Sequence, residues 1–319
     1  MTEATTAQPL SLETPAALTR AAAIKQRPPR TLWGDAWRRF RRHRMAMLGL
    51  TILSFLIIAT LLGPFIYTES PRRIDFSKAM HAPNPSNILG TDDLGRDMLA
   101  RLLLGGRISL AVGVTAMIIS ISLGTIIGST AGFLGGRLDT LLMRLTDLFL
   151  ALPVVPLLLL LIFLFRDTLR RLMGPELGIF WLIVFVIGVL NWMTVARLVR
   201  GSFLSLKEKE FVEAATMVGV RRLRIMFRHI LPNTLGPIIV AATLSVGAAI
   251  ITESVLSFLG LGFPPDVPTW GRLLYDGQNF LEFAPWMVLF PGFLIFLTVL
   301  CINFMGDGLR DALDPRQRG

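Results

Sequence analysis

A short acidic segment in the second half of this chain carries the residues whose types and spacing could do chemistry. Glu208, Glu210 and Glu213 lie close together between two long apolar runs. Carboxylates placed in this way can accept charge-assisted hydrogen bonds from a basic surface on another protein. Gly219 follows, and a glycine allows the chain to reverse direction by adopting a positive φ. The segment therefore predicts a docking element for a partner outside the apolar phase.

The segment also has the pattern of a helical hairpin. We expect a first helix over residues 208–218, which contains Ala214 and Ala215, and a second, basic helix over 221–230. Leu231 and Pro232 follow, and the proline is expected to break the helix before the next apolar run. A hairpin of this kind, held between two apolar segments, belongs at a membrane surface.

Glu253 is the one carboxylate deep within a long apolar run. A charge in a membrane is costly, so such a group faces protein or water and marks a functional position by default. One interpretation is that Glu253 lines a path or faces a partner. The other is structural: Ser254, Thr252 or a neighbouring helix satisfies the carboxylate by hydrogen bonding.

No residues with the spacing of a known catalytic centre occur in the chain. It has neither a Gly-x4-Gly-Lys-Ser/Thr loop nor a Gly-x-Gly-x-x-Gly loop for phosphate. Its 3 histidines are far apart, and with one cysteine, Cys301, no metal-binding cluster or intrachain disulfide can form. We therefore predict a chain that is not an enzyme, with any ATP hydrolysis in a partner.

Composition places these residues in a membrane protein. Hydrophobic residues make up 53% of the 319 residues and charged residues only 17%, unlike a water-soluble domain. Six windows lack Asp, Glu, Lys and Arg altogether: 45–68, 108–136, 148–165, 177–196, 229–252 and 283–306. Each has the ~18–20 residues that a helix needs to cross a hydrocarbon core of about 30 Å. The fold class is therefore all-α, a polytopic membrane protein with six transmembrane helices.

The net charge of +10 is explained by topology. If the N-terminus is cytoplasmic, 22 of the 32 Lys and Arg residues lie in inner segments. This is the positive-inside bias, and it places both termini in the cytoplasm. We therefore expect a lipid membrane as the surroundings and no nucleic acid as a partner.

The third window contains Pro153 and Pro156, which are expected to kink its helix and free backbone carbonyls. A kinked helix can line a translocation path, although a plain packing kink is the alternative. Together with Glu253, these prolines are the candidate residues for such a path or for an interface with a second membrane subunit.

The remaining segments divide as follows. Residues 1–32 lack a secretory signal and are expected to be a disordered cytoplasmic tail. Residues 33–46 place Trp33, Trp37 and Phe40 on one face and are rich in Arg, which predicts an amphipathic elbow helix on the inner leaflet or, alternatively, a plain stop-transfer flank. We expect a first transmembrane helix over 47–67 and an external segment over 68–106. A five-helix core is expected over 107–308, with a cytoplasmic coupling loop over 201–232, and a cytoplasmic C-terminus over 309–319.

The external segment contains a second polar motif. Its members are Gly90, Thr91, Asp92, Gly95, Arg96 and Asp97. Thr91 or Asp92 is a suitable N-cap for a helix that begins at Asp93, with acidic side chains at its positive end. In the structural interpretation, this capped helix orients the first two spans.

These motifs resemble a known family. Glu213-Ala214-Ala215, then Gly219, Leu231 and Pro232, are similar to the EAA signature of permease subunits from ATP-binding-cassette importers. His229 stands where the general pattern has Ile, and the run 228–233 resembles the peptide-transport branch of the family. The external motif, residues 106–110 and the C-terminal run 306–315 resemble the C-type subunit of dipeptide and oligopeptide permeases. The resemblance extends from about Trp33 to the C-terminus.

The resemblance implies a type I ABC importer permease fold in the bacterial cytoplasmic (inner) membrane. Such a subunit forms half of a translocation pathway for dipeptides or oligopeptides. The implied partners are a second homologous permease in a heterodimer, two ABC ATPase subunits that bind ATP and Mg, and an extracytoplasmic solute-binding protein. The hairpin would be the ATPase-coupling helix, and the external motif would lie near the binding protein. No cofactor is expected in this chain.

Two alternatives remain open at the level of sequence. The same importer fold serves nickel chelates, glutathione or opines. A stand-alone secondary transporter is a different class, but it would need several intramembrane acids and an inverted repeat, whereas only Glu253 is deep and no repeat is evident.

Overall fold

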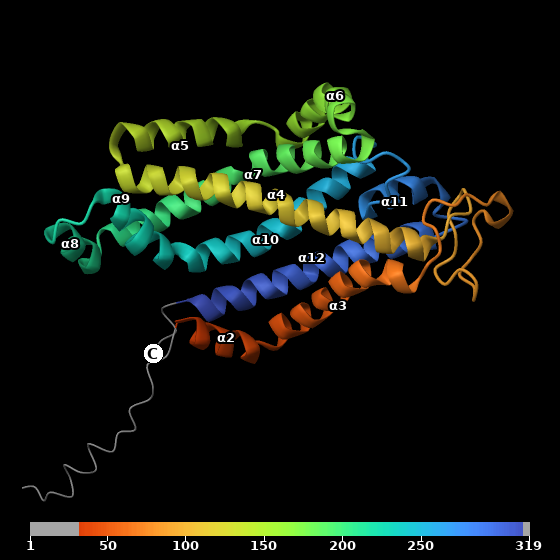
Figure 1. Cartoon of the computed structure of the whole chain (residues 1–319), viewed down its shortest axis with the longest axis horizontal. Coiled ribbons are helices and arrows are strands. Elements are labelled where there is room, and N and C mark those ends of the chain that lie inside the picture. The colour runs from red at the N-terminus through yellow and green to blue at the C-terminus, as the bar shows by residue number, and fades with distance from the viewer. Residues whose placement is uncertain (1–31, 315–319) are drawn as a thin grey trace, which may run out of the picture.

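The computed structural model describes residues 32–314, which form an elongated bundle of helices without a β-sheet (Figure 1). The predicted all-α fold class is confirmed for this part of the chain. Residues 1–31, which hold nearly all of the expected N-terminal tail, and 315–319 lie outside the described residues. Five helices are long and apolar enough to cross a membrane: α3 (Arg44–Ile66), α4 (Met98–Leu134), α7 (Pro175–Lys207), α10 (Leu231–Phe258, preceded by α9 and η2) and α12 (Trp286–Leu313).

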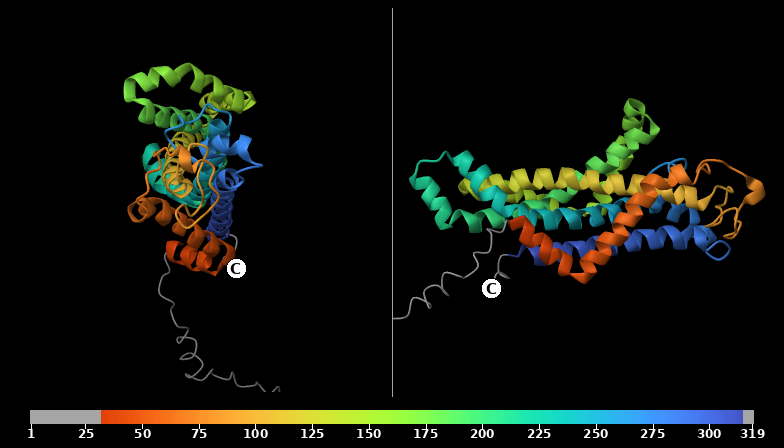
Figure 2. Two further views of the ribbon diagram at one scale, coloured as in Figure 1. Left: turned by 90° about the vertical axis from the view of Figure 1, so that its right-hand side faces the viewer. Right: turned by 60° about the horizontal axis from the view of Figure 1, so that its bottom comes forward.

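The third predicted span is broken. The window 148–165 falls on two helices, α5 (Gly136–Ala151) and α6 (Val154–Met173), which are bent by 86° at the break and make the sixth span only as a pair. Pro153 is the N-cap of α6 and Pro156 lies in its first turn. The predicted kink is therefore a sharp break between helices, because a proline lacks the N–H that would continue α5. Figure 2 shows α6 projecting sideways from the bundle.

The centre of the bundle is the contact between α4 and α7. Val112 and Ala116 of α4 and Ile183 and Ile187 of α7 are all nearly inaccessible to solvent and belong to one hydrophobic cluster. One ion pair adds α5 to this unit: Arg200 of α7 donates two hydrogen bonds to the carboxylate oxygens of Asp139, at 2.5 and 2.7 Å. The three helices therefore form one packed unit.

The two ends of the bundle have different elements. One end has α2 (Leu32–Arg42), α8 (Glu210–Met217), α9 (Arg222–Arg224) and the C-terminal end of α12 (Figures 1 and 2). The other end has the segment 67–97, with the short η1 (Phe76–Lys78), and the helices α11 (Trp270–Gly277) and η3 (Gln278–Phe280). The hairpin and the external motif of the sequence thus lie at opposite ends, as a helix bundle that spans a membrane requires.

The ends of two predicted segments differ from the structure. The elbow was expected to reach residue 46, whereas α2 ends at Arg42 and α3 begins at Arg44. The cause is His43, whose Nδ1 accepts a hydrogen bond from the Ala46 amide at 3.1 Å and caps α3. At the other terminus, α12 continues to Leu313, past the expected end of the core at residue 308.

Pro232 does not end a helix, contrary to the sequence prediction. Residues 222–258 form one continuous helical stretch in which the π-helix η2 (Ile225–Ile230) directly precedes α10. The amide of Leu231 donates to the carbonyl of Met226, which lies five residues earlier. This wider turn leaves room for the proline ring and removes the need for its missing N–H.

The arrangement of the ends predicts an accessibility pattern. Ser205, at the end of α7, and Ser86, in the segment 67–97, are exposed at opposite ends of the bundle. With Cys introduced at each position, a membrane-impermeant thiol reagent added to intact cells is expected to label Ser86→Cys and not Ser205→Cys. Labelling of Ser205→Cys from outside would reverse the predicted orientation.

Candidate functional site

The acidic hairpin lies exposed at one end of the bundle. Glu210 and Glu213 lie in the first turn of α8 and are exposed, as is Ala214, while Ala215 is partly buried against the core. Glu208 is the C-cap of α7, so this residue belongs to the preceding helix and not, as expected, to the first helix of the hairpin. Two of the three glutamates therefore share the first turn of one short helix.

Gly219 makes the turn of the hairpin with φ +81°. The Val220 amide donates to the Ala215 carbonyl at 3.1 Å, and the Gly219 amide donates to the Thr216 carbonyl at 3.0 Å. This is the pattern of a Schellman-type helix end, in which a left-handed residue is usually glycine. No atom lies within 4 Å of the position of an added Cβ, so the backbone angle alone disfavours other residues here.

Apolar side chains on the hairpin divide into an anchored and a free set. Val212 of α8 is 5% exposed and packs with Phe203 and Ile230, which fixes the hairpin to α7 and to the start of the α10 stretch. Met217 and Val218 at the tip are 87% and 84% exposed. Exposed apolar groups beside carboxylates at the end of a membrane bundle are typical of a surface that another protein covers.

The external motif is buried rather than exposed. Asp92, Arg96 and Arg101 are 1%, 6% and 1% exposed. Oδ2 of Asp92 accepts hydrogen bonds from Arg96 Nε at 2.7 Å and from Arg101 Nη1 at 2.8 Å. Arg101 also donates to Asp276 of α11 at 3.0 Å, and Arg272 lies 2.8 Å from the other oxygen of Asp276. We call these five residues the outer ion cluster.

The remaining members of the motif shape its loop. Gly90 and Gly95 have φ +75° and +73°, and Thr91 is fully buried, with its hydroxyl donating to the Lys78 carbonyl at 2.5 Å. Burial and the neighbouring Asp92 carboxylate raise the pKa of Asp93. The motif therefore holds the segment 67–97 against the bundle.

The helix after the motif begins later than predicted. It was expected from Asp93 with Thr91 or Asp92 as N-cap, whereas α4 begins at Met98. Asp97 is the N-cap and accepts from the Ala100 amide at 2.8 Å. Its other oxygen accepts from the Tyr67 hydroxyl and from Asn87, both at 2.8 Å. Burial and this hydrogen bond to Asp97 raise the pKa of Tyr67.

Glu253 is fully buried and hydrogen-bonded to three hydroxyl groups. One oxygen accepts from Ser257 at 2.7 Å and from Thr269 at 2.8 Å, and the other accepts from Ser109 of α4 at 3.3 Å. The sequence analysis offered Ser254, Thr252 or a neighbouring helix as hydrogen-bond partners of Glu253. Neither Ser254 nor Thr252 is a partner. Besides Ser257 of the same helix, the partners come from the neighbouring helix α4 and from the loop before α11. Glu253 thus joins α10, α4 and α11 at the end of the bundle that holds the outer ion cluster.

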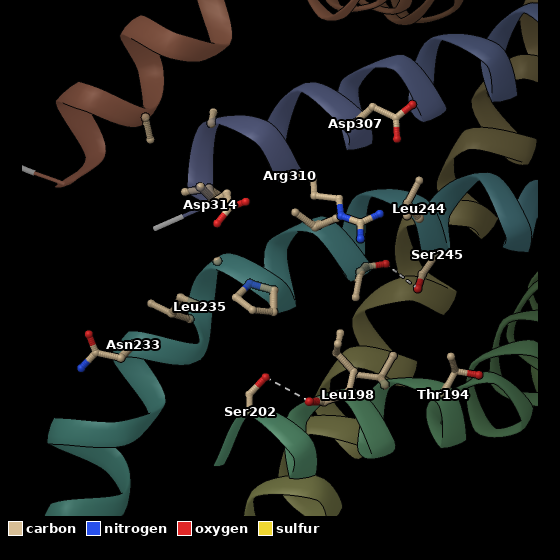
Figure 3. A pocket seen from close by; sticks show the side chains of 18 of the residues that line it. Thr194, Leu198, Ser202, Asn233, Leu235, Leu244, Ser245, Asp307, Arg310 and Asp314 are labelled. Carbon is tan, nitrogen blue, oxygen red and sulfur yellow. Dashed lines mark hydrogen bonds between the residues drawn. The ribbon is translucent and has the colours of Figure 1, made fainter. Parts of the chain in front are cut away.

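The structure brings together a set of residues that the sequence did not single out. A cavity of about 1050 Å³ lies between α2, α7, α10 and α12, towards the end with α8 (Figure 3). Of the predicted site residues, only Pro232 lines it; Glu253, Pro153 and Pro156 do not. The signal in the sequence was the series of polar residues within apolar helices, such as Asn191, Thr194, Ser202 and Ser245.

Comparisons with known proteins give a consistent result. Residues 124–319 match the family described as "Binding-protein-dependent transport system inner membrane component", and residues 31–83 match "N-terminal TM domain of oligopeptide transport permease C". The chain is 44% identical over 291 residues to the "Oligopeptide transport system permease protein OppC" of Haemophilus influenzae, covering 91% of this chain and 90% of the relative. It is 41% identical to the "Dipeptide transport system permease protein DppC" of Bacillus subtilis, over 94% of this chain and 90% of the relative.

Two further similarities are weaker. The chain is 36% identical to the "Glutathione transport system permease protein GsiD" of Pectobacterium atrosepticum, over 94% of this chain and 97% of the relative. Among solved structures, a chain of the inward-facing MetNI methionine ABC transporter superposes with a TM-score of 0.55, at 18% identity, over 68% of this chain and 98% of that one. At this identity the superposition shows the fold, which is the predicted ABC importer permease fold.

The outer ion cluster predicts a strong dependence of stability on Arg101. Arg101→Met leaves Asp92 and Asp276 buried without one partner, and breaking a buried pair costs about 3–5 kcal/mol. The variant is expected to unfold at a markedly lower temperature in detergent. The matched control is Arg72→Met, because Arg72 forms an exposed ion pair with Glu176 at 2.7 Å, which is worth ~0–1 kcal/mol. Equal unfolding temperatures for the two variants would contradict a stabilising role for the cluster.

Glu253 gives a second stability prediction. Glu253→Leu removes the acceptor of three buried hydroxyl groups, and each unsatisfied buried group costs about 1–3 kcal/mol. Thermal unfolding of the purified chain should therefore occur well below that of the parent protein. Thr252→Val is the control, since Thr252 is only partly buried and donates to the Ala248 carbonyl of its own helix. A Glu253→Leu variant with the stability of the control would show that the three hydrogen bonds contribute little.

Proposed function

This chain belongs to the family of binding-protein-dependent transport system inner membrane components, and from that premise we propose that it is the permease subunit of an ATP-driven importer of dipeptides or oligopeptides. The observation that carries the proposal is the similarity to peptide permeases along nine-tenths of the chain. The subunit is a multi-pass protein of the inner membrane, and its chemistry is binding and movement rather than catalysis.

The partners follow from the same premise. A second, homologous permease completes the pathway, two ATPase subunits bind the hairpin, and a solute-binding protein delivers cargo at the other end. The excess of Lys and Arg on the side of the hairpin supports a cytoplasmic position for α8 and both termini. ATP and Mg belong to the ATPase subunits, since this sequence has no phosphate-binding loop.

The coupling step uses the exposed face of α8. Glu210 and Glu213 accept charge-assisted hydrogen bonds from a basic groove on the ATPase subunit. The exposed Met217 and Val218 contact an apolar surface beside that groove. Val212 transmits a displacement of the hairpin to α7 and α10, because it packs into the cluster that these helices share. A rigid-body shift of this kind is an ordinary way to alternate access in transporters.

Peptides are favoured over the other cargoes of the importer fold. The oligopeptide and dipeptide relatives are 39–44% identical to this chain, whereas the glutathione relative is 36% identical. A stand-alone secondary transporter is disfavoured, because its coupling ions need intramembrane acids that are free to bind and Glu253 is occupied by three hydroxyl donors.

The proposal predicts that Gly219→Leu and Glu213→Lys uncouple transport. At φ +81° a leucine is strained by roughly 1–2 kcal/mol, which shifts the hairpin from its turn. In Glu213→Lys, the introduced positive charge is repelled by the basic groove of the ATPase subunit. We expect about a tenfold loss of peptide-stimulated ATP hydrolysis in reconstituted vesicles, together with weaker co-purification of the ATPase subunits.

Matched controls separate coupling from folding. Gly201→Leu changes an exposed glycine of α7 with no atom within 4 Å of its added Cβ and no positive φ, and Glu282→Lys reverses an exposed charge at the other end of the bundle. Both should retain ATPase association and stimulation. Full association and stimulation in Gly219→Leu and Glu213→Lys would remove the coupling assignment.

A further inference from the structure

The two faces of α2 have different surroundings. Ala36 and Phe40 are buried, and they form one apolar cluster with Ala46 of α3 and Ala312 of α12. Gly308 permits this contact, because an added Cβ would collide with Ala46 and lie 3.3 Å from the Phe40 ring. α2 therefore lies against the start of α3 and the end of α12 (Figure 1), and protein rather than lipid covers its apolar face.

The opposite face of α2 is basic. Arg38, Arg41 and Arg42 stand at i, i+3 and i+4, so they share one side of the helix, and all three are exposed. Arg44, at the start of α3, is exposed as well. Within residues 32–314, none of these four arginines forms an ion pair. Like charges spaced in this way repel one another, so anions from outside the described chain would stabilise this face.

These arginines lie where the first span enters the membrane. α3 begins at Arg44, and its exposed apolar side chains begin at once with Met45 and Leu48. In α2, Trp37 is 53% exposed, and its ring stacks on Phe40 with 5.8 Å between the centroids. Exposed tryptophans are typical of the headgroup level of a bilayer. The four positive charges are therefore placed at the depth of the lipid headgroups.

We propose that Arg38, Arg41, Arg42 and Arg44 form a binding surface for anionic phospholipid headgroups. A guanidinium can donate two parallel N–H groups to the oxygens of one phosphate. A cluster of roughly four to eight Lys or Arg beside a transmembrane helix attracts anionic lipids, and each residue strengthens the attraction about fivefold. The proposed orientation of the chain places these headgroups in the inner leaflet. The inference adds a lipid partner to the importer and does not depend on which cargo it carries.

The neighbouring side chains favour lipid over other anions. Trp37 is next to Arg38, and Met45 and Leu48 follow Arg44 within about one turn, so exposed apolar groups flank the charges in the chain. A lipid matches such a surface, because the long stems of Arg pack on apolar groups while their charged ends reach the phosphate. A free phosphate ion or an acidic protein loop would leave these apolar groups in water. Since the buried face of α2 packs against α12, bound headgroups hold both helices at one depth in the bilayer.

The test measures how closely labelled lipids approach this corner in the assembled complex. A fluorescent donor is attached at Leu48→Cys in a chain that also carries Cys301→Ala, before the complex is assembled and reconstituted in phosphatidylcholine vesicles without ATP or peptide. The acceptor is a small fraction of lipid labelled on its acyl chain, either phosphatidylglycerol, which is anionic, or phosphatidylcholine, which has no net charge. Energy transfer to phosphatidylglycerol is expected to be about twofold higher. Raising the salt from about 0.1 to 1 M should remove the difference, because the Debye length falls from ~10 to ~3 Å.

Variants assign the preference to the arginines. The combined replacement of Arg38, Arg41 and Arg42 by Gln should make energy transfer to the two lipids nearly equal, because the attraction depends on the charges. Replacement of the same three residues by Lys should retain most of the preference, since lysine keeps the charge. Both variants should unfold near the temperature of the parent protein, because exposed residues without partners contribute little to stability.

The matched control removes the same number of charges from the same end of the bundle. Arg221, Arg222 and Arg224 are exposed on the hairpin and α9, away from the start of α3 (Figure 1). Their combined replacement by Gln should leave the preference for phosphatidylglycerol unchanged. A loss equal to that of the α2 variant would show an effect of net charge rather than a surface on α2, and would contradict the inference.

Three further results would also overturn it. Equal energy transfer to the two lipids in the parent complex would show that this corner does not select anionic lipid. A preference that persists in the triple glutamine variant would place the selection elsewhere. A preference in the isolated chain that disappears in the complex would show that a partner subunit covers this face. Because the vesicles hold neither ATP nor peptide, each result stands whether or not the complex imports peptides.

Discussion

Neutralisation of buried charge in the outer ion cluster is the constraint on which the arrangement of the bundle depends. Asp92, Arg101 and Asp276 come from three separate segments, and each is almost inaccessible to solvent or to lipid. Charges in such surroundings are tolerated only with partners in good geometry. The segment 67–97, α4 and α11 must therefore keep their relative positions, and Glu253 extends the same requirement to α10.

The other end of the bundle is built on a different principle. There α2, α7, α10 and α12 diverge around a large cavity, and α8 is attached mainly through Val212. Apolar and hydroxyl contacts of this kind can rearrange at a lower cost than a buried ion cluster. The bundle thus combines one end held by buried ion pairs with another end held by apolar and hydroxyl contacts. The packed unit of α4, α5 and α7 connects the two ends.

The sequence predicted features that depend on local composition. The apolar windows identified the spans because a run of about twenty predominantly apolar residues is long enough to cross a membrane as a helix. The turn at Gly219 was predictable because a helix end followed by a reversal requires a positive φ. The family resemblance supplied the fold, which no local pattern contains.

Features that depend on long-range contacts were not predictable. The late start of α4 arises because Asp97 caps the helix while Asp92 is held by Arg101 and Asp276, and α11 lies far away in the sequence. Two of the three hydroxyl partners of Glu253, Ser109 of α4 and Thr269 before α11, likewise come from other segments. Pro232 was misinterpreted because a π-helical turn can absorb a proline. The cavity is a property of four helices together.

Accumulation of labelled peptide in vesicles tests the central claim most directly. The complex is assembled with and without this chain, and uptake of a radiolabelled dipeptide is followed in the presence of the binding protein. The account predicts uptake that requires this chain and ATP, that persists when ion gradients are collapsed, and that excess unlabelled peptide suppresses while glutathione or nickel does not. Uptake driven by an ion gradient without ATP, or uptake of glutathione alone, would contradict it.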